Sequence, residues 1–95
     1  MIKSRTYVAG MAAALVLAGC SGLPDDTTDQ DVVNYQIAVA SIGCEMKYES
    51  DYLPVELQAG LTREQTLAIS SYMVATDRAV RLPEGGVKLT TGACA

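Results

Sequence analysis

The stretch that decides the fold runs from residue 62 to residue 90 and reads TREQTLAISSYMVATDRAVRLPEGGVKLT. It opens with a capping box, because Thr62 can accept a hydrogen bond from the backbone of Gln65 while the Gln65 side chain reaches back. Apolar residues then recur at intervals of three and four, which predicts a helix with one buried face. We expect that face to hold Ala68, Ile69, Tyr72, Met73, Thr76, Ala79 and Val80, with Glu64, Ser70, Ser71, Asp77 and Arg78 largely on the other face.

The same stretch changes its period after this helix. Apolar and polar residues alternate over residues 80–82 and again over residues 87–89, with Pro83-Glu84-Gly85-Gly86 between them. Two short alternating runs around a glycine-rich turn predict a β-hairpin.

Upstream, a first helix is predicted from a capping signal at Thr28 to Asp31 up to Gly43. It carries two adjacent apolar stripes, which predict a broad buried face. The first stripe is Val32, Tyr35, Val39, Ile42 and Met46, and the second is Val33, Ile37, Ala40 and Cys44. Residues 44–48 are expected to be extended.

A shorter second helix is predicted from Tyr52 to Ala59. Asp51 can cap its start, Pro54 is tolerated in a first turn, and Gly60 supplies a left-handed stop.

The resulting order, helix, extended piece, helix, turn, helix and hairpin, resembles that of a winged-helix domain. The likeness covers Leu53 to Thr90, where Gly60 and Leu61 fit the turn and Ile69 fits a core position of the third helix. Glu56 and Thr66 depart from it, since a small and an apolar residue are common there. The sequence therefore predicts a mainly α fold with a small C-terminal β-hairpin, winged-helix-like. The alternative is a three-helix bundle with an appended hairpin.

The N-terminal residues have the composition of a secretory signal. Lys3 and Arg5 are followed by an uncharged, mostly apolar segment that ends at Gly19. Its apolar run of about a dozen residues is shorter than the roughly 20 that a membrane-spanning helix needs. The segment is therefore predicted to be a signal peptide.

The end of this segment, Leu17-Ala18-Gly19-Cys20, resembles the lipobox of bacterial lipoproteins. The resemblance implies cleavage between Gly19 and Cys20, with a diacylglycerol and a fatty acyl group attached to Cys20. Because Ser21 rather than an aspartate follows, it also implies an outer-membrane location facing the periplasm. Residues 20–30 would then form a lipidated, flexible acidic tether, and residues 31–95 a small domain.

Lipidation of Cys20 leaves Cys44 and Cys94 as an even pair. In the oxidising compartment that a secretory signal implies, these two residues are predicted to form a disulfide. The alternative is a redox-active or metal-binding pair. No Cys-x-x-Cys motif is present and the chain has no histidine, so two thiols are too few for a zinc site. No metal or other cofactor is expected beyond the acyl groups on Cys20.

Charge and composition narrow the function. Without residues 1–19 the chain keeps five basic and eleven acidic residues, a net charge of −6, which disfavours nucleic-acid binding. A carboxylate-based hydrolase could use Glu45, Glu49, Asp51 and Glu56, but such clusters usually form a solvated face. We expect a non-catalytic interaction or structural module of the cell envelope with a protein partner and no small-molecule substrate. A small lysis-type or toxin-type lipoprotein is the other alternative. Tyr48, Tyr52 and Leu53 are the predicted partner contacts.

Overall fold

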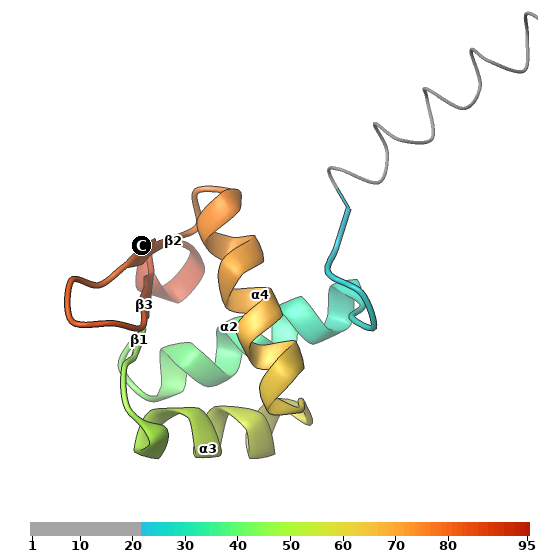
Figure 1. Cartoon of the computed structure of the whole chain (residues 1–95), viewed down its shortest axis with the longest axis horizontal. Helices are drawn as coiled ribbons and strands as arrows, with labels where there is room; N and C mark the ends of the chain where they lie inside the picture. Colours follow the sequence, from blue (N-terminus) through green and yellow to red (C-terminus); the bar gives the residue numbers. More distant parts are fainter. Residues whose placement is uncertain (1–21) are drawn as a thin grey trace, which may run out of the picture.

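The computed structural model describes residues 22–95 (Figure 1). Its helices and strands follow the order predicted from the sequence. The elements are α2 (Asp29–Ser41), β1 (Glu45–Met46), α3 (Glu49–Ala59), α4 (Arg63–Ala75), β2 (Ala79–Arg81), β3 (Val87–Leu89) and the 3₁₀-helix η1 (Gly92–Cys94). The predictions for the signal peptide, the cleavage site at Gly19 and the lipidation of Cys20 lie outside the described residues.

The predicted hairpin belongs to a three-stranded antiparallel sheet in the order β1-β3-β2. Residues 44–48, expected to be extended, supply β1, in which Glu45 pairs with Lys88 and Met46 with Val87. The central strand β3 therefore joins the segment after α2 to the hairpin. The hairpin is thus hydrogen-bonded into the fold through β1, and the protein is mainly α with a small three-stranded antiparallel sheet.

Helix α2 lies at the centre of the domain and contacts α3, α4, η1, β1 and β3 (Figure 1). Every element except η1 contributes at least one fully buried or nearly buried apolar side chain to one core. The members of that core are Val32, Tyr35, Ala38, Val39, Met46, Val55, Ala59, Leu61, Ile69, Met73, Ala79, Val87 and Leu89. A single continuous core is what a small domain needs to stay folded.

The predicted start of α2 is confirmed by both halves of a capping box. The Thr28 hydroxyl accepts from the Asp31 N–H at 3.1 Å, and the Asp31 carboxylate accepts from the Thr28 N–H at 3.0 Å. The preceding segment is also attached, since Leu23 packs against the core and the Asp26 carbonyl accepts from the Gln65 side chain at 2.7 Å. The domain therefore begins before residue 31, and the part of the predicted tether from Leu23 onward lies against the fold.

The second helix begins earlier than predicted. Helix α3 starts at Glu49, so Asp51 is its third residue and does not occupy the N-cap position. Its carboxylate still caps the helix from within, accepting from the N–H groups of Lys47 at 2.8 Å and Tyr48 at 3.0 Å. Pro54 consequently falls in the second turn, on the exposed side of the helix. The left-handed stop at Gly60 is confirmed, with φ of 70°.

The third helix keeps its predicted start at the Thr62–Gln65 capping box, but its end differs. Helix α4 stops at Ala75, and Asp77 adopts φ of 61°, so the chain turns before Ala79 and Val80 enter β2. Assigning these two residues and Thr76 to the helical face was therefore wrong. The helical spacing continued past the helix by coincidence, because Ala79 is buried from the strand instead.

Ser70 was assigned to the exposed face and is in fact buried. Its hydroxyl shares a hydrogen bond of 2.6 Å with the hydroxyl of Tyr35 on α2, and burial raises the pKa of Tyr35 to about 12. This bond lets α4 keep a polar residue on its core face, because neither buried hydroxyl is left without a partner.

Thr66 and Glu56, the two residues that depart from the winged-helix pattern, are both accommodated by contacts of their side chains. Thr66 is fully buried, and its hydroxyl donates to the Thr62 carbonyl at 2.9 Å, so only its methyl group faces the core as an apolar residue would. Glu56 is half-buried and forms an ion pair with Arg63. Both residues therefore fit the fold through side-chain hydrogen bonds.

Replacing Tyr35 by phenylalanine is expected to lower the free energy of unfolding by about 1–3 kcal/mol, because the Ser70 hydroxyl stays buried without a partner. In the double variant Tyr35→Phe/Ser70→Ala both polar groups are gone, and most of the loss should be recovered. Urea denaturation of the two single variants and the double variant measures this coupling. Additive losses in the double variant would show that the bond between α2 and α4 contributes little.

Candidate functional site

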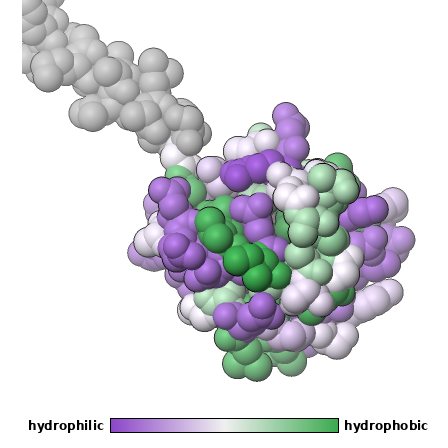
Figure 2. Space-filling view, turned by 180° about the vertical axis from the view of Figure 1, so that it is seen from behind, coloured by the Kyte–Doolittle hydropathy of each residue, from purple (hydrophilic) through white to green (hydrophobic). Residues whose placement is uncertain are grey.

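The second apolar stripe of α2 does not enter the core. Val33 is 45% exposed and Ile37 is 57% exposed, so the prediction of a broad buried face is wrong. The helices and the sheet cover only the side of α2 that carries Val32, Tyr35, Ala38 and Val39. Val33 and Ile37 point away from that side. The face of the domain seen from behind carries a hydrophobic patch with hydrophilic residues around much of it (Figure 2).

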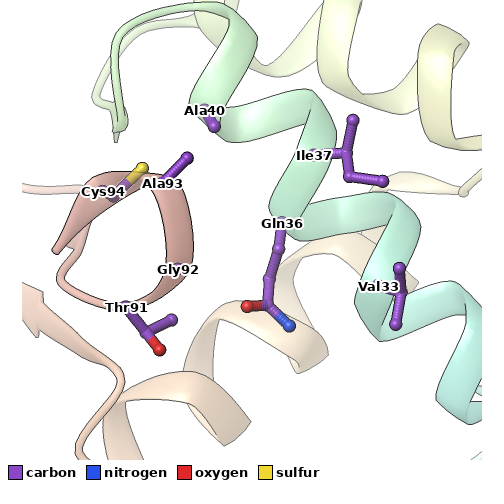
Figure 3. Close-up of a pocket in the computed structure, with 8 residues that line it drawn as sticks. All are labelled: Val33, Gln36, Ile37, Ala40, Thr91, Gly92, Ala93 and Cys94. Atoms are coloured by element: carbon purple, nitrogen blue, oxygen red, sulfur yellow. The ribbon is translucent and has the colours of Figure 1, made fainter.

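This stripe forms one side of a groove whose other side is the C-terminal tail. The groove is lined by Val33, Gln36, Ile37 and Ala40 of α2 and by Thr91, Gly92, Ala93 and Cys94 (Figure 3). Its volume is about 260 Å³, below the range of roughly 300–1,000 Å³ that is usual for small-molecule sites. The shape suits a few side chains of a macromolecule better than a whole small ligand.

The Cys44–Cys94 disulfide holds the tail side of the groove in place. The two Cα atoms are 5.7 Å apart, within the usual range for a disulfide, and the bond joins residues 50 positions apart. It ties η1 to the end of α2, as the pairing of the two remaining cysteines predicted. Cys94 thus contributes to the groove wall as well as to the closure of the chain.

The groove is uncharged in a domain that is otherwise rich in charge. Neither residues 32–44 nor residues 90–95 include an acidic or basic side chain. The polar groups that line the groove are the Gln36 amide and the Thr91 hydroxyl, on opposite sides (Figure 3). A partner could therefore bury apolar side chains here without desolvating a charge, which is the costly step in most interfaces.

The three predicted partner contacts lie elsewhere, around the start of α3. Tyr48 is 63% exposed and Leu53 is 49% exposed, whereas Tyr52 is half-buried against the core under the Arg63 guanidinium, 4.7 Å from its ring centroid. The most exposed large hydrophobic residue in the part of the chain described is Leu57 on α3, at 84%, which the sequence analysis did not single out. None of these residues lines the groove.

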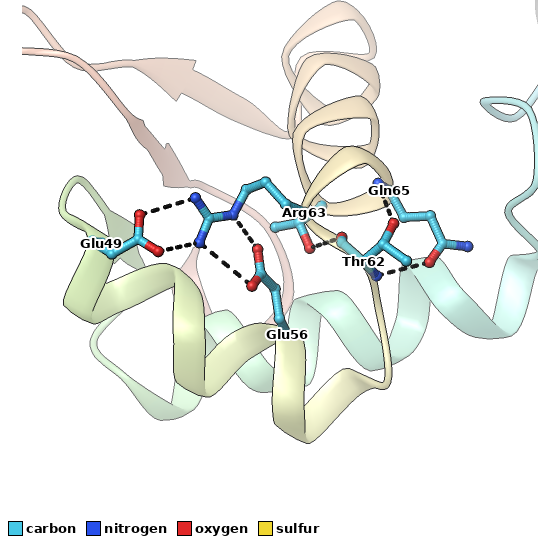
Figure 4. Close-up of polar contacts among 6 residues, drawn as sticks. Glu49, Glu56, Thr62, Arg63 and Gln65 are labelled. Carbon is cyan, nitrogen blue, oxygen red and sulfur yellow. Dashed lines mark hydrogen bonds and ion pairs between the residues drawn. The ribbon is translucent and has the colours of Figure 1, made fainter.

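The acidic cluster around α3 is engaged in structural contacts. Arg63 binds Glu49 through two hydrogen bonds of 3.0 and 2.7 Å and also pairs with Glu56, linking α3 to the start of α4 (Figure 4). Hydrogen bonds from Arg63 lower the pKa of Glu49. Hydrogen bonds from the Lys47 and Tyr48 N–H groups lower the pKa of Asp51. Groups held ionised in this way are poor proton donors for general acid catalysis.

A second hollow, of about 470 Å³, lies at the start of α4 and is lined by Asp25, Asp26, Thr62, Glu64, Gln65 and Ala68. Its carboxylates do not converge, and no group of three or more metal-ligating side chains occurs within residues 22–95. The groove between α2 and η1 is therefore the better candidate for a functional site.

The comparisons with known proteins give no further lead. No family model matches the chain, and no curated protein or solved structure is significantly similar to it. Among the helices of residues 22–95, none combines the length and the apolar character required to cross a bilayer.

Proposed function

We propose that the protein is a lipoprotein anchored through acyl groups on Cys20 in the outer membrane, facing the periplasm. Its folded domain would be a non-catalytic protein-interaction module of the cell envelope. The N-terminal signal and its lipobox support the anchor. The groove beside α2 supports the interaction role, because it offers apolar surface without a catalytic arrangement.

The position of the three cysteines is the observation that carries this proposal. Cys44 and Cys94 are bonded to each other inside the fold, whereas Cys20 precedes Leu23, which is the first of residues 22–95 that packs against the core. This leaves Cys20 as the cysteine available for modification, at the residue where the lipobox resemblance places the lipid.

The attachment of Leu23 gives the proposed anchor a specific geometry. Only Ser21 and Gly22 separate Cys20 from Leu23, and three extended residue steps span at most about 11 Å. The domain would therefore lie against the leaflet that carries its acyl chains. Because a net charge of −6 is repelled by anionic head groups, the covalent anchor would supply the attraction.

The engaged carboxylates favour a module over the carboxylate-based hydrolase. Glu49, Glu56 and Asp51 hold helix ends and an ion-pair network together. The continuous core likewise argues against the lysis-type alternative, for which a folded domain is not needed.

Replacing Cys20 by serine tests the anchor. Metabolic labelling with a fatty acid should be lost completely, and the protein should remain as a precursor longer by 19 residues. The Cys44→Ala/Cys94→Ala variant is the control, since it keeps Cys20 and should still be labelled. Unchanged labelling of Cys20→Ser in mass spectrometry or gel analysis would refute the lipoprotein assignment.

A further inference from the structure

The apolar stripe of the groove ends in a carboxylate. Asp29 precedes Val33 by one helical turn, and residues spaced by three and four lie on one face, so Asp29, Val33, Gln36 and Ala40 follow one line along α2. Asp29 is exposed, and the ion pairs within residues 22–95 involve only Glu45, Glu49 and Glu56. One end of the uncharged groove therefore carries a negative charge that no basic side chain of the described domain neutralises.

No basic residue lines the groove, and none of those in residues 22–95 forms an ion pair with Asp29. Lys47 pairs with Glu45, Arg63 pairs with Glu49 and Glu56, and the Arg78 guanidinium lies 5.2 Å from the Tyr72 ring centroid. Arg81 and Lys88 are on the hairpin. Asp25 and Asp26 precede Asp29, so the potential around the start of α2 is negative and attracts cationic partners.

These charges distinguish between the occupants that an apolar groove can accept. A second copy would bring Asp29 and a further net charge of −6 into the interface, which is unfavourable. An anionic membrane surface is repelled for the same reason. A partner with apolar side chains and adjacent basic residues gains from both the groove and the charge at its end.

We infer that the groove between α2 and η1 binds an amphipathic helix of a partner protein. The apolar face of that helix is flanked by basic residues. This names the partner class of the proposed interaction module and rests on that proposal. Apolar side chains of the helix contact Val33, Ile37 and Ala93, while a Lys or Arg reaches Asp29. The Gln36 amide and the Thr91 hydroxyl provide hydrogen bonds at the two sides of the groove (Figure 3).

The direct test uses the protein as purified from cells, placed in phosphatidylcholine nanodiscs, and a fluorescent peptide of about 16 residues, long enough to form a helix in water. The peptide presents leucines at i, i+3, i+4 and i+7 with lysines beside them, and a second peptide carries glutamates in place of the lysines. The lysine peptide should bind saturably, and its affinity should fall as the salt concentration is raised. The glutamate peptide should not bind. Absence of saturable binding, or equal binding of both peptides, overturns the inference.

Two matched variants locate the binding site. Ile37→Glu should weaken binding of the lysine peptide by about tenfold or more, because it places a charge in the apolar groove. Leu57→Glu adds the same charge at an exposed apolar residue outside the groove and should change the affinity less than about twofold. Asp29→Asn should weaken binding about two- to fivefold and reduce its salt dependence. Equal losses in Ile37→Glu and Leu57→Glu would overturn the assignment of the site.

Other occupants and the failure of the anchor give separate results. Sedimentation of a dimer that Ile37→Glu dissociates would assign the groove to a second copy and refute the proposed partner. If the lipoprotein assignment is wrong, fatty-acid labelling of Cys20→Ser will show it, and peptide binding will be unchanged. Failure of peptide binding likewise leaves the labelling of Cys20 unchanged, so the two proposals can fail independently.

Discussion

Replacing Cys44 and Cys94 together by alanine is expected to lower the free energy of unfolding by about 4 kcal/mol. The disulfide closes a loop of 50 residues, and removing it returns that loop-closure entropy to the unfolded chain. Domains of this size are stabilised by roughly 5–15 kcal/mol in total. The disulfide should therefore supply between about a quarter and four fifths of the total stability of the domain.

Removing the disulfide should also disrupt the side of the groove that the C-terminal tail forms. After β3 the chain contributes η1, which contacts α2 and has no fully buried residue of its own. Without the disulfide, little apolar burial holds η1 to α2, and hydrogen exchange should become faster in residues 91–95 than in β3. The groove and its peptide binding would then depend on an oxidised Cys44–Cys94 pair.

Urea denaturation of the oxidised protein and of the double alanine variant measures the stability effect. Dithiothreitol should destabilise the unsubstituted protein by a similar amount and leave the variant unchanged, which separates bond loss from side-chain loss. A variant within about 1 kcal/mol of the oxidised protein would show that the core alone maintains this domain.

Local signals in the sequence were sufficient where the decisive contacts are close along the chain. The capping boxes at Thr28 and Thr62 and the left-handed Gly60 each involve residues no more than four apart, and all three are present. The alternation around Pro83-Glu84-Gly85-Gly86 likewise predicted the hairpin. Such features depend on backbone geometry that a few residues fix by themselves.

The wrong predictions of burial concern residues whose environment depends on contacts between distant segments of the chain. Ser70 looks like a surface residue in its own helix, and only the Tyr35 hydroxyl, 35 residues away, makes its burial favourable. Val33 and Ile37 look like core residues, but the other elements cover only one side of α2. Helical periodicity identifies an apolar stripe without showing whether another element reaches it.

The candidate site was missed for a related reason. Three predicted partner contacts lie at the start of α3, whereas the groove forms where the tail returns to α2 through a bond that spans 50 residues. The sequence did hold one usable signal, because residues 32–44 and 90–95 both lack charge in a strongly acidic chain. Two neutral segments joined by a predicted disulfide could have been read as neighbouring surfaces.

Substituting alanine for Gly86 is expected to destabilise the protein by about 2–5 kcal/mol, which combines backbone strain with overpacking. Gly86 has φ of 88°, and a Cβ atom there would overlap the Met46 carbonyl and lie 2.8 Å from the Lys47 Cα. Both neighbours are backbone atoms, so no side chain can rotate away to make room. β1 would have to move from β3, which would weaken the pairing of Met46 with Val87.

Gly85 provides the matched control for this effect. It lies in the same turn with φ of 108°, yet a Cβ atom added there would have no neighbour within 4 Å. Gly85→Ala should therefore cost only the backbone strain, about 1–2 kcal/mol. The difference between the two variants in urea denaturation isolates the close approach of the hairpin turn to β1. Equal losses would mean that the turn can move away from β1 freely, and that β1 contributes little to the stability of the domain.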